Sequence, residues 1–410
     1  MDNESPYPTS SGTEEEKKEE PVDVVKVEKD LEIERACQKS DIKELITLAT
    51  SKNGLGSDTM RRIAWPILLG SALEGLKIDD AWKYLPRHKD EDQVKLDVDR
   101  SFIYYPSDQS EKQLAHSKEQ LSALITRTLR CHPTLSYFQG YHDIVQVLLL
   151  VLGPALAFPA LERLSLLRIR DYMLPDLDPA LAHLKLIPAI LVQADTKLYK
   201  HLSHTQPFFA LAATLTLYAH DIEEYGDIAR LFDFLIAHEA IITIYLFVAI
   251  VLSRKSELLG VPLDEPEMLH SILSKLPKPL DLEVFISRTM ELYTKFPPES
   301  LPWGAWRQIS LNSVLKTTRD PLARQTLEDG EWFLEEQKIE LRWQKRRADA
   351  IQLMKKYKRP AVSIGMAVLV AILAYWLRKS GTSAPIFAFL AKKWSMLKPV
   401  LWDMYNDYFH

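Results

Sequence analysis

Two short stretches, 94–100 and 137–143, carry the side chains best suited to chemistry. In the first, Asp97 and Arg100 stand three residues apart, so a helix would place them side by side as a charge pair. A guanidinium steadied in this way can donate to two oxygens of one phosphate. In the second, the amide of Gln139 can orient a water by donating one hydrogen bond and accepting another. An arginine with a glutamine is the pair that GTP hydrolysis uses: one neutralises the transferred phosphoryl group and the other positions the attacking water.

Composition limits the classes of fold and function. The chain has 410 residues, of which 47% are apolar and 26% charged, as in an ordinary globular protein. Its net charge of -5 gives no reason to expect a nucleic-acid partner. Cys37 and Cys131 lack metal-ligand spacing, which argues against a disulfide framework and against a metal site. With 13 glycines and long runs of helical apolar periodicity, the sequence predicts an all-α fold.

The apolar pattern places both stretches beside helices. Residues 114–131 predict an amphipathic helix that ends at His132-Pro133. Gln139 then lies in a loop before an apolar helix with its body at 144–152, which at about ten residues is too short to cross a bilayer and predicts a buried core helix.

An earlier helix is predicted after a cap at Ser57-Asp58. Pro66 inside its pattern predicts that the helix ends or kinks there, because proline lacks the backbone N–H that continues the ladder. Trp65 is interpreted as a core anchor rather than a contact for a ligand.

Three motifs follow one another in the sequence. They are Arg61 to Gly70 with its Trp65-Pro66 pair, Val94-x-x-Asp97-x-x-Arg100, and Tyr137-x-Gln139-Gly140. Over roughly residues 54–300, these motifs resemble those of the TBC domain, the GTPase-activating domain for Rab proteins. Two departures stand out, since valine occupies position 94 where isoleucine is usual, and Tyr141-His142-Asp143 replaces a Met-Asn type of sequence.

The resemblance implies a two-lobed helical domain that acts in trans on a GTP-bound Rab. Arg100 would reach the phosphates of the partner's GTP, and Gln139 would orient the water in place of the GTPase's own glutamine. Asp97 would position Arg100, Tyr137 would pack beside the glutamine, and Gly140 would let a partner's backbone approach. No Gly-rich loop with Lys-Ser/Thr occurs in the sequence, so the chain is expected to have no cofactor of its own, with GTP and Mg held by the Rab.

The segment 361–377 is predicted to be a transmembrane helix, because it is uncharged, carries Tyr375-Trp376 at one edge and has basic residues at both ends. The richer basic flank lies before it, which predicts a cytosolic N-terminal bulk. Its short length fits the thin endoplasmic-reticulum bilayer. The resemblance is greatest to a reticulum-anchored member of the family, which implies the Rab-one or Ypt-one type of Rab in ER-to-Golgi traffic. The predicted organisation is a disordered acidic tail (1–30), the TBC domain (31–300, motif core 54–252), a polar and basic helical linker (301–360), the membrane helix (361–377) and a short tail that is an interfacial candidate (378–410).

Other interpretations stay open at this point. The fold could bind a Rab as a membrane-anchored effector without catalysis, with Arg100 and Gln139 as an exposed ion pair and a helix cap. The substitution Arg100→Ala separates the two, since an effector would tolerate it. A multispan membrane protein using 144–152, 240–252 and 361–377 is disfavoured by the lengths of these runs.

Overall fold

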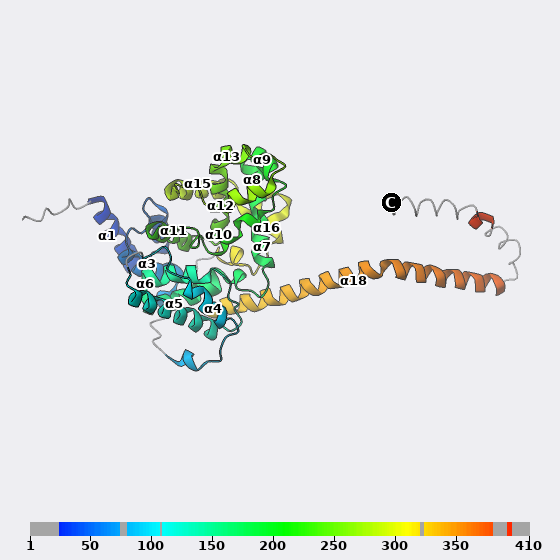
Figure 1. Ribbon diagram of the computed structural model, residues 1–410, viewed down its shortest axis with the longest axis horizontal. Coiled ribbons are helices and arrows are strands. Elements are labelled where there is room, and N and C mark those ends of the chain that lie inside the picture. Colours follow the sequence, from blue (N-terminus) through cyan, green and yellow to red (C-terminus); the bar gives the residue numbers. More distant parts are fainter. Residues whose placement is uncertain (1–23, 74–79, 107–108, 320–323, 380–391, 396–410) are drawn as a thin grey trace, which may run out of the picture. The chain divides into compact units, whose positions relative to one another are not determined.

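Every described element of the chain is a helix, which confirms the all-α class. The structure is a computed structural model with two compact units, Met1–Lys338 and Ile339–His410. The helices are shown in Figure 1. The structure describes residues 24–73, 80–106, 109–319, 324–379 and 392–395. Most of the predicted acidic tail and most of the predicted C-terminal tail lie outside the described residues, and α1 already begins at Val24.

The first helices are α1 (Val24–Gln38), α2 (Ile42–Thr50) and α3 (Asp58–Leu69). The predicted cap is confirmed, because the Ser57 side chain accepts a hydrogen bond from the Met60 backbone. The prediction that the helix ends or kinks at Pro66 is wrong. The proline falls in the last turn of α3, and the helix runs on to a left-handed cap at Gly70.

Asp233 on α11 (Tyr225–Ala237) joins the first motif to the rest of the core. Its fully buried carboxylate accepts from the Trp65 indole at 2.8 Å and from Arg61 Nε at 3.0 Å, both to Oδ1. Burial alone would lower the pKa of Arg61, but the charge and hydrogen bonds of Asp233 outweigh it and raise that pKa. Arg61 and Trp65 therefore hold α3 on α11, as the interpretation of Trp65 as a core anchor required.

The next helices carry the other two motifs. They are α4 (Glu91–Asp99), α5 (Glu111–Cys131) and α6 (Tyr141–Leu167). Helix α6 packs against both α3 and α5 (Figure 1). The helix predicted at 114–131 begins slightly earlier, because Ser110 and Gln113 form a reciprocal capping box at its start.

Helix α6 is longer than the ten or so residues expected. Its backbone leaves the helical region at Gly153, with φ 71° and ψ 165°, and then resumes to Leu167. Among the described helices, α6 alone is long and apolar enough to cross a membrane. Its most apolar stretch is 72% buried, as in the core helix of a globular domain. The shorter run at 240–252 forms most of α12 (Ile242–Ser253), which is buried from Ile242 to Val251. Burial, more than length, argues against the multispan interpretation.

The remaining helices lie in the first unit, where α12 packs on α8 and α15, except that α18 continues past Lys338 into the second unit. They are α7 (Asp178–Leu184), α8 (Leu186–Ala194), α9 (Thr196–Leu202), α10 (Leu211–Leu215), α13 (Lys255–Leu259), α14 (Pro266–Leu273), α15 (Leu282–Lys295), α16 (Ala305–Gln308), α17 (Val314–Thr317) and α18 (Leu327–Lys379). Short 3-10 turns are η1 (Ser71–Leu73), η2 (Ala81–Tyr84), η3 (Arg170–Tyr172), η4 (Pro207–Ala210), η5 (Pro298–Ser300) and η6 (Pro302–Gly304).

The first unit extends beyond the predicted domain boundary at 300. Trp306, Leu315 and Leu334 are buried, although they lie in the segment expected to be a polar linker. Gln337 is also buried and its amide donates to Asp171 Oδ1 at 2.9 Å. The start of α18 is thus part of the helical core. The sequence did not reveal this, because the buried residues are scattered within a charged stretch.

Candidate functional site

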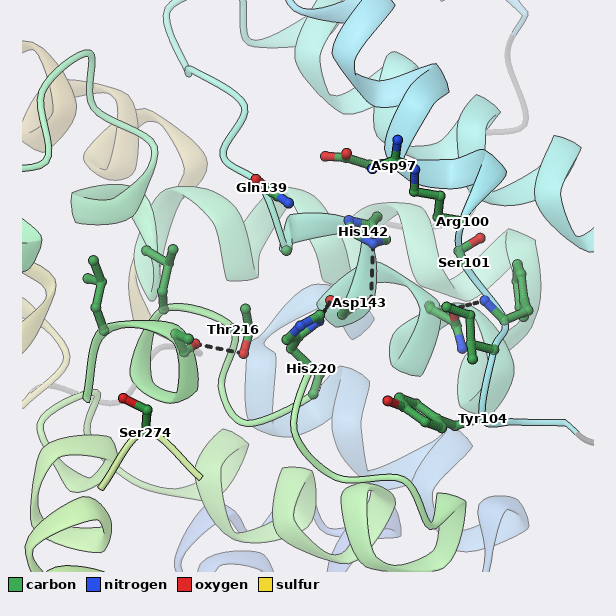
Figure 2. Close-up of a pocket in the computed structure, with 18 of the residues that line it drawn as sticks. Asp97, Arg100, Ser101, Tyr104, Gln139, His142, Asp143, Thr216, His220 and Ser274 are labelled. Atoms are coloured by element: carbon green, nitrogen blue, oxygen red, sulfur yellow. Dashed lines mark hydrogen bonds and ion pairs between the residues drawn. The ribbon is translucent and has the colours of Figure 1, made fainter. Parts of the chain in front are cut away.

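Arg100 lies at the end of α4, at the edge of a cavity of about 670 Å³ (Figure 2). Its backbone caps the helix, and the Asp99 carbonyl beside it accepts from Lys118 Nζ at 2.6 Å. The side chain is exposed and has no hydrogen bond or ion pair with any described residue. A guanidinium in this position is fixed at its base and free to meet an incoming anion.

The Asp97 carboxylate does not pair with the Arg100 guanidinium. It is buried, and its oxygens accept from the Tyr137 hydroxyl and from the Gln93 amide, each at 2.9 Å. Asp97 contacts Arg100 through the backbone, where its carbonyl accepts the Arg100 N–H at 3.1 Å. In place of the expected ion pair, the hydrogen bond from the Tyr137 hydroxyl to Asp97 links α4 to the stretch before Gln139.

Tyr137 ties that stretch down at two points. Its backbone N–H donates to Asp90 Oδ2 at 2.9 Å, and its hydroxyl donates to Asp97 Oδ2. Burial and then the Asp97 carboxylate raise the pKa of the Tyr137 phenol far above its usual range. The hydroxyl therefore stays protonated and keeps donating, which holds the stretch before Gln139 against α4.

Gln139 lies in the turn before α6, exposed and without a hydrogen bond to any described residue. Gly140 follows as the N-cap with φ +98°, in the left-handed region that favours glycine. A Cβ on Gly140 would lie 2.5 Å from Thr216 Cγ2. Gly140 is buried against Thr216 of its own chain and permits the close approach of that side chain. The approach of a partner's backbone to Gly140 stays a prediction.

The substitution Gly140→Ala is expected to destabilise the chain by about 1–3 kcal/mol, because it forces alanine into a strained backbone and against Thr216. It should also displace Gln139 and lower activity. The free energy of unfolding measures the first effect. The second substitution Thr216→Ser removes the clashing methyl and should restore part of the stability.

The matched control is Gly226→Ala in α11, where an added Cβ meets nothing within 4 Å and φ is not positive. This control should be neutral or slightly stabilising, since alanine favours helix more than glycine does. Equal stability of the Gly140 and Gly226 variants would contradict the account of Gly140.

A chain of polar side-chain contacts runs along the cavity near the two exposed residues. His142 Nδ1 lies 3.2 Å from the Tyr137 hydroxyl, and His142 Nε2 lies 3.3 Å from Asp143 Oδ1. Asp143 Oδ2 contacts His220 Nδ1 at 3.0 Å (Figure 2). The bond to Asp143 raises the pKa of His220, although burial opposes the shift. The sequence marked His142 and Asp143 as a departure from the family pattern, but no signal pointed to His220.

The structure thus brings Arg100 and Gln139 to one cavity, with Asp97 and Gly140 in its lining. Arg61, Trp65 and Pro66 are not among the lining residues and serve the core. Among the residues that the structure describes, no group of three or more His, Cys, Asp or Glu side chains is arranged to hold a metal ion. The arrangement offers one cation and one neutral amide to a bound partner.

Comparison with known proteins identifies the family. The sequence profile of the Rab-GTPase-TBC domain matches residues 58–259, which include all three motifs. GTPase-activating protein gyp10 of Schizosaccharomyces pombe is 33% identical over 71% of this chain and 78% of its own length. The chain belongs to the Rab-GTPase-TBC family. This confirms the family that the three motifs resembled.

Further similarity supports the placement of this TBC chain. TBC1 domain family member 20 of Homo sapiens is 34% identical over 64% of this chain and 65% of its own length. The crystal structure of the Ypt/Rab-GAP domain of Gyp1p superposes with a TM-score of 0.53, at 15% identity, over 64% of this chain and 99% of that one. The structural likeness shows the shared helical fold. The relative gyp10 is named a GTPase-activating protein, and the Gyp1p structure is that of a Ypt/Rab-GAP domain.

Proposed function

We propose that this TBC chain accelerates GTP hydrolysis by a Rab GTPase through Arg100 and Gln139, both supplied in trans. The observation that carries the proposal is that these two exposed side chains lie at one cavity and have no partner among the described residues. Side chains that serve the fold are instead paired, as Asp97 and Tyr137 are. Unpaired polar groups that converge on one cavity are available to a ligand.

In the proposed mechanism, the Rab brings GTP and its Mg, and the TBC chain supplies two side chains. The Arg100 guanidinium neutralises charge that develops on the transferred phosphoryl group. Gln139 accepts from the attacking water and donates to the phosphoryl oxygens, which fixes the water in line. The bond from Tyr137 to Asp97 links the segments that carry the two side chains, so they approach the nucleotide as one unit.

We further propose that residues 361–377 anchor the chain in the endoplasmic-reticulum membrane, with the TBC domain facing the cytosol. Within this segment, Gly365–Trp376 is an apolar stretch of α18, shorter than a full span by itself. Its large side chains are exposed, an arrangement that favours a lipid environment. They are Met366, Val368, Leu369, Val370, Ile372, Leu373, Tyr375 and Trp376.

The proposed substrate is a Rab of the Rab-one or Ypt-one type, in ER-to-Golgi traffic. Support comes from the similarity to TBC1 domain family member 20 and from the apolar segment near the C-terminus. An anchor would confine the activity to the membrane where such a Rab works. Flotation of the full chain with liposomes, compared with a chain ending at residue 360, tests the anchor. Equal flotation of the two chains would contradict it.

The activity is tested with the full chain in detergent micelles and a panel of GTP-loaded Rabs, followed by single-turnover hydrolysis. Acceleration of one Rab by orders of magnitude is the expected result, and it names the substrate in the same experiment. Binding to a Rab without any acceleration would instead support the effector interpretation and overturn the proposal.

A further inference from the structure

The segment that follows Arg100 is held in place by a side chain outside all three motifs. We propose that Gln146 on α6 is a positioning residue for Arg100, which fixes the backbone beyond it through two buried hydrogen bonds. The inference rests on the proposed function of Arg100. Gln146 lines the same cavity but is only 4% exposed, so it presents almost no surface to a nucleotide.

Both ends of the Gln146 amide bind this segment. Its Oε1 accepts the Phe102 backbone N–H at 3.0 Å. Its Nε2 donates to the Tyr105 carbonyl at 3.2 Å. Phe102 and Tyr105 are themselves buried, so removing the amide would leave a buried N–H and a buried carbonyl without these partners, which is costly.

The backbone held by Gln146 is strained. Phe102 has φ 61°, a left-handed conformation that a bulky residue rarely adopts. Such a residue stays in place only where its surroundings fix it, and strain of this kind gathers at functional sites. Here the fixing contacts are the Gln146 acceptor and the Ser101 hydroxyl, which donates to the Val98 carbonyl at 2.7 Å. The chain therefore turns sharply just after Arg100.

One helix then sets the positions of both proposed fingers. Gln139 and its Gly140 cap begin α6, and Gln146 lies about two helical turns further along the same helix. Since the Arg100 side chain has no partner among the described residues, its base is placed by the backbone on either side. The end of α4 fixes one side, and Gln146 fixes the other.

The test is the substitution Gln146→Met in the full chain, which keeps the volume and removes both hydrogen bonds. A misplacement of about 1 Å can lower a rate by roughly 10²-fold, so kcat should fall roughly 10- to 100-fold. The affinity for the GTP-bound Rab should stay near that of the wild type, because Gln146 is buried and is not part of the surface that a Rab would contact. Single-turnover rates and Rab affinity are measured together.

A double-mutant cycle with Arg100→Ala shows whether Gln146 acts through Arg100. If it does, Gln146→Met lowers the rate in the wild-type background and has no further effect in the Arg100→Ala background. An equal loss in both backgrounds, or no loss in the wild-type background, would overturn the inference. If Arg100→Ala is itself fully active, the proposed function fails instead, and the two failures are thereby distinguished.

Two further variants separate positioning from general destabilisation. Tyr245→Phe removes a partly buried hydrogen bond from the Tyr245 hydroxyl to the Phe296 carbonyl, away from the cavity, and should lower stability while leaving kcat unchanged. In Gln146→Glu, a protonated carboxyl can still accept from Phe102 and donate to Tyr105, but an ionised one cannot donate. Its rate relative to wild type should therefore rise as the pH falls. A Gln146→Glu rate with a flat pH profile, or a Tyr245→Phe loss of kcat matching that of Gln146→Met, would count against positioning.

Discussion

Replacing Arg100 with alanine should lower the single-turnover rate of Rab-bound GTP hydrolysis roughly 10³- to 10⁵-fold, which is the rate enhancement that an arginine finger gives to a GTPase. The reason is that Arg100 is exposed at the cavity and unpaired, so its charge is available to the phosphoryl group. Its removal leaves no unpaired partner behind in the described structure, so the fold should keep its stability. Arg100→Lys should recover part of the rate at most, because an ammonium lacks the planar fork of the guanidinium.

The control is Arg288→Ala, which removes another exposed arginine, on α15 and outside the cavity lining. This variant should match the wild-type rate, which excludes a simple effect of surface charge. If Arg100→Ala keeps the wild-type rate, or if Arg288→Ala loses as much, the arginine finger is excluded.

Gln139→Ala should lower the same rate roughly 10²- to 10³-fold, the scale of losing one hydrogen-bonding group aimed at a transition state. The amide lies in the turn before α6 and has no hydrogen bond that the fold would lose. Gln139→Glu should also be impaired, because a carboxylate accepts from water but cannot donate to a phosphoryl oxygen. Rates at saturating chain report this step separately from Rab binding.

Gln344→Ala provides the matched control for the glutamine. Gln344 is exposed on α18 and lies outside the cavity lining, so its loss should leave the rate unchanged. Wild-type activity in Gln139→Ala would show that the GTPase positions its own water and that Gln139 has no part in the chemistry.

The sequence predicted the features that depend on local pattern. Apolar periodicity and end signals located the helix of residues 114–131 and the cap at Ser57, because both depend on residues a few positions apart. The same signals placed Gln139 in a turn before α6. The motif resemblance selected Arg100 and Gln139 as the pair to examine, and the structure places both at one cavity.

Side-chain hydrogen bonds between residues far apart in the sequence were not predicted. A spacing of three residues is compatible with an Asp97–Arg100 pair, but the Tyr137 hydroxyl competes for the same carboxylate and holds it. The partner of Arg61 and Trp65, Asp233, is 172 and 168 positions away, respectively, and no local pattern reveals it. A bond of this kind depends on how helices meet in space, which periodicity does not specify.

The surroundings of glycine and proline residues were also predicted less well, because they too depend on contacts between segments far apart in the sequence. The close contact of Gly140 with Thr216 of its own chain was not predicted, because the two residues are far apart in the sequence. Pro66 was expected to end or kink a helix that in fact continues to Leu69, because a proline in the last turn removes one backbone hydrogen bond without ending the helix. The charged segment after 300 concealed buried positions such as Leu334, which contact other elements only in the folded unit.

The central claim is that Gln139 takes over the water-positioning role in trans. The most direct test uses a responsive Rab whose own catalytic glutamine has been replaced by alanine, in single turnover with the full chain. We predict that wild-type chain still accelerates hydrolysis by this Rab by orders of magnitude, and that Gln139→Ala abolishes the acceleration. If the altered Rab fails to respond to wild-type chain while the unaltered Rab responds, the GTPase positions its own water and the two-finger account is wrong.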